Sequence, residues 1–194
     1  MDEKQERRDN ILEAAALVFS EKGYHQARVE EIAVQAGIGK GTVYEYFASK
    51  LELFQEMFGT LLGRWFEELY GTEVWEGPVV EQLRRILVVH LEFINRNARL
   101  ARVTFVDSYG VDQELDQWMY EQRQEKVERM EQFFCEGIQR GEFRDDLDAA
   151  LLAQIFTGAL ASVVVPVVME EIEIDAAATA NRVLEVLMHG IAAR

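Results

Sequence analysis

The sequence has few of the residues on which disulfide-bonded or sheet-rich proteins depend. Its 194 residues include one cysteine, Cys135, and two prolines. A single cysteine excludes an internal disulfide and fits a reducing compartment. The first ten residues are charged and polar, so we expect no secretory signal and a cytoplasmic protein. Two prolines among abundant Ala, Leu, Glu and Arg favour long helices over sheets.

Patterns that would indicate catalysis are also scarce. The three histidines, His25, His90 and His189, lie far apart, and none has a Glu three residues before it, as a helical di-iron site would need. One cysteine without a partner motif predicts no zinc site, and we expect Cys135 to be a small core residue. We therefore predict no catalytic residue, no metal and no cofactor. An enzyme is the alternative from another class.

Basic residues are also few compared with acidic ones, and the formal net charge is −15. Residues 1–50 hold seven Lys/Arg against nine Asp/Glu, so the acidic excess lies almost entirely in the remaining residues. This balance excludes a polybasic, histone-like DNA binder. It permits a site-specific one, because an acidic body keeps non-specific binding to DNA weak.

Apolar residues recur at helical spacing along almost the whole chain. The first pattern begins at Ile11 and stops at Gly23, and a short second pattern stops at Gly37. After a third short segment, Ser49 to Glu52 has the pattern of a capping box. A long apolar stripe follows as far as Leu69 and predicts a helix that joins two parts of the chain.

Helical patterns resume after a break at Gly71 to Pro78, and no run alternates with the period of two typical of strands. The sequence predicts an all-α protein of about nine helices, with a three-helix head over residues 1–50 and a larger antiparallel helical body over 51–194. The helices expected in the body after the break cover roughly 78–96, 98–108, 113–140, 147–170 and 175–192.

Ala149 to Met169 is a run of 21 residues without a charge, which is long enough to cross a membrane. The run contains polar and small residues, and the acidic Asp148 and Glu170 flank it instead of aromatic or basic anchors. We therefore expect a helix buried between the body core and a subunit interface, and a membrane span is the alternative. Pro166 is expected to kink or end this helix.

Residues 29–48, VEEIAVQAGIGKGTVYEYFA, predict two short helices joined by a tight turn. Gly37 can adopt the positive φ that such a turn requires, and the small Ala33 allows the helices to pack closely. Val43 and Phe47 are four residues apart and would anchor the second helix. Its opposite face then presents small and hydrogen-bonding residues, which suits the major groove of DNA.

Several residues of this segment have side chains or positions suited to DNA. Gly41 would let the helix approach a duplex closely, and Thr42 and the tyrosine hydroxyls can bond to phosphates or base edges. Lys40 and Lys50 lie at or near helix N-termini, where free backbone N–H groups favour an anion. The alternative is a plain helical corner with both tyrosines in its core.

The stretch from Arg8 to Phe54, about a quarter of the chain, strongly resembles the N-terminal domain of the TetR family of bacterial transcription regulators. The resemblance implies that the helix at about 40–46 enters the major groove and that the body forms a homodimer. It also implies that a small molecule bound in the body changes the spacing of two heads. The matching segments are Ile11–Ala15, Phe19, Gly23-Tyr24, Val29–Ala33, Ala36–Ile38, Lys40–Tyr44, Tyr46-Phe47 and Ser49–Phe54.

Three positions depart from the family pattern. Ala27-Arg28 stands where the family has a capping Ser or Thr, and Arg28 is expected to contact a phosphate instead. Gly39 is a weaker cap than Ser, and Glu45 places a negative charge on the exposed face. A helical interaction module without DNA binding is the alternative that Gly39 and Glu45 favour. The DNA-contacting residues implied by position are Arg28, Lys40, Gly41, Thr42, Tyr44, Tyr46 and Lys50.

The body is rich in aromatic residues, enough to line an apolar pocket for an effector. Leu100–Ala150 is similar to the corresponding section of family members that bind fatty acyl-CoA, whereas the acidic body equally favours a lipophilic cation. Repression is the family's commoner mode, with activation as the alternative. The residues predicted to contact the effector are Trp65, Phe66, Phe93, Phe105, Tyr109, Trp118 and Phe134.

The last two long helices carry the apolar and small residues that a two-fold interface requires. One such helix pair from each subunit would form a four-helix interface, and the operator would be a near-palindrome. The residues predicted to lie in the interface are Leu152, Phe156, Gly158, Ala159, Val163, Val183, Leu184, Leu187 and Ile191.

Overall fold

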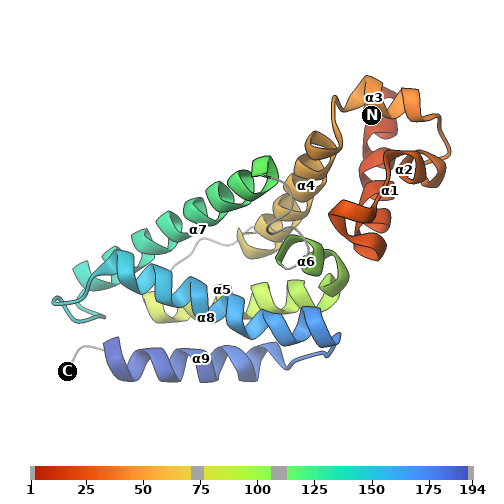
Figure 1. Ribbon diagram of the computed structural model, residues 1–194. Helices are drawn as coiled ribbons and strands as arrows, with labels where there is room; N and C mark the ends of the chain where they lie inside the picture. The colour runs from red at the N-terminus through yellow and green to blue at the C-terminus, as the bar shows by residue number, and fades with distance from the viewer. Residues whose placement is uncertain (1–2, 71–76, 106–112, 192–194) are drawn as a thin grey trace. The chain divides into compact units, whose positions relative to one another are not determined.

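The computed structural model describes residues 3–70, 77–105 and 113–191, over which the chain forms nine α-helices and no β-strand (Figure 1). The prediction of an all-α fold is confirmed, and most predicted helix ends lie within a few residues of the observed ones. The helices are α1 (Glu3–Gln26), α2 (Val29–Gln35), α3 (Lys40–Tyr46), α4 (Lys50–Tyr70), α5 (Val79–Arg96), α6 (Ala98–Phe105), α7 (Gln113–Gln139), α8 (Ala149–Glu170) and α9 (Ala176–Ile191).

Packing divides the chain into two compact units. Unit 1 comprises residues 1–64 and 97–116, and unit 2 comprises 65–96 and 117–194. The division falls inside α4, after Arg64, and it assigns α6 to unit 1. The functional boundary expected between residues 50 and 51 concerns DNA binding, which packing does not report, so it stays a prediction.

Unit 1 is held together by an aromatic cluster between α1 and α4. Phe19, Tyr24 and Phe54 are buried, with ring centroids 5.1 to 5.9 Å apart. Gly23 interrupts the helical backbone of α1 with φ 71°, a value that glycine adopts without a steric cost. Because the chain turns there, Tyr24 packs into the cluster. The three helices α1 to α3, red to orange in Figure 1, and α6 complete the unit.

In unit 2, α5 packs against both α8 and α9. The inward face of α5 is apolar, and Leu83, Leu87 and Leu91 are each at most 1% exposed. The Asn95 side chain, near the end of α5, donates to the Ile174 carbonyl at 2.8 Å and accepts from the Ile174 N–H at 3.3 Å. These two bonds fix the segment that leads into α9 against the end of α5.

The turn after α7 contributes one ring to an aromatic core in unit 2. Phe134, Phe143 and Phe156 pack together, with centroid distances of 5.8 and 5.9 Å from the Phe134 ring to the other two. Gly137 lies directly under the Phe143 ring, and a Cβ there would collide with it. Glycine at 137 is therefore required by close packing, which explains part of the 137–144 pattern.

Acidic residues lie at both ends of helix α8, directly before its first residue and at its last. Asp148 is the N-cap, and its carboxylate accepts from the Leu151 N–H at 3.1 Å. The helix continues through Pro166 to Glu170, so of the two effects expected of this proline, a kink or an end of the helix, the end is excluded. By length and composition α8 is the one helix among the described residues that could span a membrane, and 33% of its most apolar window is buried.

Candidate nucleic-acid interface and effector-binding residues

Helices α2 and α3 form the tight corner that the sequence predicted. Gly37 adopts φ +70°, and the Ile38 N–H donates to the Ala33 carbonyl at 2.9 Å, which closes the turn. The Asn10 side chain of α1 donates to the Ala36 carbonyl at 3.1 Å. The corner is therefore fixed both by its own backbone and by α1.

The two sides of α3 differ as its residue pattern requires. Val43 and the following Phe47 are each 1% exposed and anchor the helix against unit 1. Tyr44 is 44% exposed, which contradicts the alternative that it is a core aromatic. A Cβ at Gly39 or Gly41 would meet nothing within 4 Å, so the subunit's own packing does not require glycine there. The outer face of α3 is open to a large partner.

Residues at the edge of this face form ion pairs within the corner. The Lys40 Nζ lies 2.6 Å from a Glu30 carboxylate oxygen and 5.6 Å from the Tyr44 ring centroid. The hydrogen bond between them raises the pKa of the Lys40 ammonium and lowers the pKa of the Glu30 carboxyl. Glu30 therefore competes with any phosphate for Lys40. The positions of the basic residues in the sequence did not reveal this acidic partner.

Glu31 forms side-chain contacts at the start of α2, where no side chain caps the helix in place of the expected hydroxyl. Its carboxylate accepts from the Arg28 N–H at 3.1 Å and pairs with Lys22 at 2.8 Å. Both hydrogen bonds, that with Lys22 first, lower the pKa of the Glu31 carboxyl. The Arg28 residue itself is exposed. It therefore stands at the start of α2, at the edge of the corner.

Lys50 occupies a different environment from Lys40. Its Nζ donates to the His25 carbonyl at 3.2 Å and lies 4.5 Å from the centroid of the Tyr24 ring. It thus ties the start of α4 to the end of α1. Five of the seven predicted DNA-contacting residues lie on α3, namely Lys40, Gly41, Thr42, Tyr44 and Tyr46. The other two, Arg28 and Lys50, lie outside this helix. Among the five, Thr42 and Tyr46 are half-buried.

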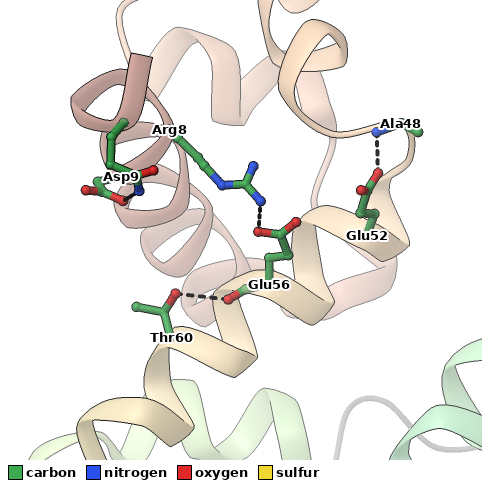
Figure 2. A network of polar contacts seen from close by, with 7 residues as sticks. Arg8, Asp9, Ala48, Glu52, Glu56 and Thr60 are labelled. Atoms are coloured by element: carbon green, nitrogen blue, oxygen red, sulfur yellow. Dashed lines mark hydrogen bonds and ion pairs between the residues drawn. The ribbon is translucent and has the colours of Figure 1, made fainter. Parts of the chain in front are cut away.

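A polar network connects α1, the end of the corner and α4 (Figure 2). Arg8 of α1 forms an ion pair with Glu56 of α4, and its guanidinium carbon lies 4.7 Å from the centroid of the Phe47 ring. The Glu52 carboxylate accepts from the Ala48 N–H, while the Glu52 N–H donates to the Ser49 hydroxyl at 3.0 Å. The predicted capping box is thus formed in a variant geometry, and the Arg8 contacts are an addition that the sequence did not reveal.

The Glu56→Gln substitution should lower the stability of unit 1. Arg8 and Glu56 are 28% and 33% exposed, so their charges are only partly screened by water. We expect a loss of about 1 kcal/mol in the free energy of unfolding, measured by urea denaturation. Glu68→Gln is the matched control, because the Arg96–Glu68 pair is 58% and 39% exposed and its removal should be near neutral. Equal effects of both substitutions would contradict this assignment.

The described part of the body holds four of the seven residues predicted to contact an effector. Trp65 and Trp118 are half-buried, while Phe93 and Phe134 are buried. Phe134 belongs to the aromatic core with Phe143 and Phe156, so it has a packing role as well. The Tyr109 residue and the side chains of Phe66 and Phe105 lie outside the described residues.

Two basic side chains of unit 2, on α5 and α7, lie in surroundings that disfavour a positive charge. His90 on α5 lies beside Trp65, with their rings edge to face and the centroids 5.7 Å apart. Burial, and to a lesser extent the nearby Lys126, lowers the pKa of His90 to about 3. Burial also lowers the pKa of Lys126, on α7, against the opposing effect of Glu125. His90 stood out in sequence only as an isolated histidine.

The residues predicted to form the dimer interface fall into two groups. Leu152, Phe156 and Leu184 are buried within unit 2, whereas Gly158, Ala159, Val163, Val183 and Leu187 keep part of their surface. The side chain of Ile191 lies outside the described residues. An outer stripe on α8 keeps its surface and follows helical spacing: Leu151, Ile155, Gly158, Ser162, Val165 and Met169.

No group of metal-binding side chains occurs within residues 3–70, 77–105 and 113–191. Cys135 is a free thiol on α7 and is half-buried, so the core position expected for it is only partly met.

Similarity to known proteins extends over nearly the whole chain. The model of the bacterial regulatory proteins of the tetR family matches residues 11–57, and that of the YsiA-like protein C-terminal region matches residues 54–190. The chain is 31% identical over 191 residues, 98% of both proteins, to the fatty acid metabolism regulator protein of Bacillus subtilis.

Solved structures agree with these matches. The fatty acid degradation regulator FadR from Bacillus halodurans superposes with a TM-score of 0.84 at 30% identity, covering 94% of this chain and 98% of that one. The transcriptional regulator FadR from Bacillus subtilis in complex with stearoyl-CoA superposes with a TM-score of 0.80 at 32% identity, with the same coverage.

Proposed function

Because this chain belongs to the TetR family of bacterial regulatory proteins and is a ligand-responsive DNA-binding transcriptional regulator, we propose that it is a cytoplasmic repressor whose effector is a long-chain fatty acyl-CoA. The observation that carries the DNA-binding part is the open outer face of α3, anchored from behind by Val43 and Phe47. The effector is inferred from similarity to a regulator that was crystallised with stearoyl-CoA.

The proposed DNA contacts come from the outer face of α3 and its edges. Gly41 lets a duplex approach the helix axis, and Tyr44 presents an exposed hydroxyl-bearing ring. Lys40 and Arg28 would contact phosphates, while Thr42, Tyr46 and Lys50 are further candidates. Such contacts position the protein on any duplex, and contacts to base edges then select the operator.

We expect Lys40→Ala to weaken, and Glu30→Gln to strengthen, binding to every duplex. Removing the ammonium removes a phosphate contact, whereas removing the Glu30 charge releases Lys40 from its 2.6 Å ion pair. In Lys40→Ala the slope of log K against log salt should become shallower by about 0.9 for each phosphate that Lys40 neutralises in the wild type. Fluorescence anisotropy over a salt series measures both effects.

Lys22→Ala is the matched control, since Lys22 also pairs with a glutamate of α2 but lies on α1. It should change operator affinity less than Lys40→Ala does. An operator affinity that Lys40→Ala leaves unchanged, with an unchanged salt slope, would remove Lys40 from the DNA interface.

The proposed assembly is a two-fold homodimer formed through the outer stripe of α8 together with α9. This stripe leaves Leu151, Ile155, Val165 and Met169 each 45% to 54% exposed in the single subunit. On α9, Val186 is 77% exposed. Exposed apolar side chains at helical spacing are typical of an uncovered interface, and a self-complementary patch closes at two copies.

The effector is proposed to act by linkage between the two sites. A ligand that binds better to the conformation with one spacing of the two DNA-binding heads shifts the protein toward that conformation. If the ligand lowers the affinity for DNA by some factor, DNA must lower the affinity for the ligand by the same factor. Helix α4 is the proposed lever, because its residues up to Arg64 belong to unit 1 and the rest belong to unit 2. A typical coupling of roughly 1–3 kcal/mol changes operator affinity about 5- to 150-fold.

Genome-wide binding-site mapping followed by effector titration tests the proposal. Stearoyl-CoA should release the selected operator, and operator DNA should reciprocally reduce stearoyl-CoA affinity. A lipophilic cation that releases the operator while stearoyl-CoA does not would overturn the proposed effector. A compound that stabilises the protein without changing its operator affinity would show that its site is not coupled to DNA binding.

A further inference from the structure

Helix α3 has only seven residues, so its position depends on the contacts at its two ends. A helix this short is not stable by itself in water, and packing has to hold it in place. The Gly37 turn lies before its first residue. At the other end the Phe47 N–H donates to the Val43 carbonyl at 3.0 Å, and the Phe47 ring is 1% exposed. A shift of the Phe47 ring would therefore shift α3 with it.

Arg8 of α1 holds this ring in place. Its guanidinium carbon lies over the Phe47 ring, 4.7 Å from the centroid, and the same guanidinium forms an ion pair with Glu56 of α4 (Figure 2). A planar guanidinium can bind a carboxylate with its edge while its face covers an aromatic ring. One side chain thus joins α1, the end of α3 and α4.

The short connection from Phe47 to α4 is fixed as well. The Glu52 carboxylate accepts from the Ala48 N–H, and the Ser49 hydroxyl accepts from the Glu52 N–H at 3.0 Å. Glu52 and Glu56 are four residues apart, so they lie on one face of α4. That face therefore holds both the backbone that follows α3 and the guanidinium that covers Phe47.

We propose that Arg8 is a positioning residue for DNA recognition, which fixes α3 relative to α1 and α4 through Phe47 and Glu56 without contacting DNA itself. Hydrogen bonds to base edges require accurate placement of the DNA-binding helix, because they weaken steeply with distance and angle. Phosphate contacts from long, flexible side chains tolerate a small shift. Loss of Arg8 should therefore lower operator affinity much more than affinity for an unrelated duplex. This inference rests on the proposed function in taking α3 as the DNA-binding helix.

Two other roles of Arg8 predict different results. If Arg8 only stabilised the fold, its replacement would leave nearly all molecules folded in a protein of ordinary stability, and operator affinity would not change. If Arg8 bound a phosphate, its replacement would weaken binding to every duplex. The slope of log K against log salt would then become shallower by about 0.9 for each lost contact. The ratio of operator affinity to unrelated-duplex affinity, together with the salt slope, distinguishes the three roles.

The experiment compares full-length wild type with Arg8→Met, Arg8→Lys, Glu56→Gln and the control Arg7→Met. Methionine keeps a flexible apolar side chain against Phe47, whereas lysine keeps the charge but lacks the planar guanidinium. Arg7→Met removes the same charge from the neighbouring position, where the arginine side chain is 48% exposed. Fluorescence anisotropy over a salt series measures binding to an operator selected from random duplexes and to a scrambled duplex of the same length. Urea denaturation checks that each variant is folded under the assay conditions.

We expect Arg8→Met to bind the operator at least about 10-fold more weakly, while its affinity for the scrambled duplex stays within about 2-fold and its salt slope is unchanged. Arg8→Lys should recover most of this loss. Glu56→Gln should show a smaller loss, since Arg8 can still cover Phe47, and Arg7→Met should match wild type. An unchanged ratio of the two affinities in Arg8→Met, whether both stay the same or both fall equally, would overturn the positioning role.

Lys40→Ala and Tyr44→Ala distinguish a failure of this inference from a failure of the proposed function. If both variants keep full operator affinity, α3 is not the DNA-binding helix, and the positioning role fails together with the proposed function. If both weaken operator binding while Arg8→Met keeps the wild-type ratio of affinities, only the positioning role fails.

Discussion

Gly158→Arg is expected to convert the proposed dimer into folded monomers. A Cβ at Gly158 would meet nothing within 4 Å in the subunit, so a side chain can start there without a clash at its Cβ. The helix propensity of arginine is also more favourable than that of glycine, by roughly 0.7 to 1 kcal/mol. In the proposed interface, however, Gly158 lies in the middle of the outer stripe of α8, where a partner would bury the added charge without a counterion. Sedimentation analysis and urea denaturation measure the two properties separately.

Loss of the dimer should greatly reduce operator affinity. Two linked heads that bind adjacent half-sites gain affinity because the second binding event is intramolecular, typically by roughly 100- to 10,000-fold. We expect a loss of that order for Gly158→Arg. Gly59→Arg, at an open and exposed position of α4, controls for the added charge and should stay dimeric. A Gly158→Arg protein that remains dimeric with full operator affinity would place the interface elsewhere.

His90 should make the protein sensitive to mild acid. Its pKa is lowered from 6.5 to about 3 in the folded state, first by burial and then by Lys126. Between these two values the unfolded chain binds a proton that the folded chain does not, so stability falls as the pH falls. The slope approaches about 1.4 kcal/mol per pH unit, which amounts to roughly 2 kcal/mol between pH 7.5 and 5. Well above pH 6.5 the histidine is neutral in both states and contributes no pH dependence.

The measurement is the difference between wild type and His90→Leu in urea denaturation at pH 7.5 and pH 5, at one fixed protein concentration. Taking the difference removes the contribution of the many carboxylates that both proteins share. His189→Leu is the control, because His189 is exposed at the end of α9. If the free energy of unfolding falls equally in wild type and His90→Leu between pH 7.5 and pH 5, His90 is well hydrated in the folded protein.

Much of the fold could be predicted because local rules and long-range packing agree. The α2–α3 corner depends on short-range features, namely the positive φ of Gly37 and the inward pair Val43 and Phe47, and both are found as expected. Pro166 shows the limit of such rules. The proline disfavours a continuing helix, yet α8 extends to Glu170, with Val167 and Val168 buried behind the proline. Tertiary burial therefore outweighed a local preference.

The candidate sites were predicted less completely than the fold. The sequence identified Lys40 as a basic residue beside the outer face of α3, but its partner Glu30 lies ten residues away on another helix. Arg8 was not identified, because its role depends on Phe47 and Glu56, which are distant in sequence. Interactions between residues so far apart leave no periodic signal, so no spacing rule detects them.

The sequence by itself determined the all-α class, the helix-turn-helix corner and the side of α3 that faces outward. These follow from hydrophobic period, helix caps and glycine conformation, each of which acts over a few residues. Only the tertiary structure decided that Phe156 and Leu184 are core residues while Ile155 and Val186 remain exposed. It also decided that His90 lies beside Trp65 and near Lys126. The physical reason is that burial and electrostatic environment depend on neighbours that the fold brings together, and α8 and α9 are apolar on more faces than one subunit can cover.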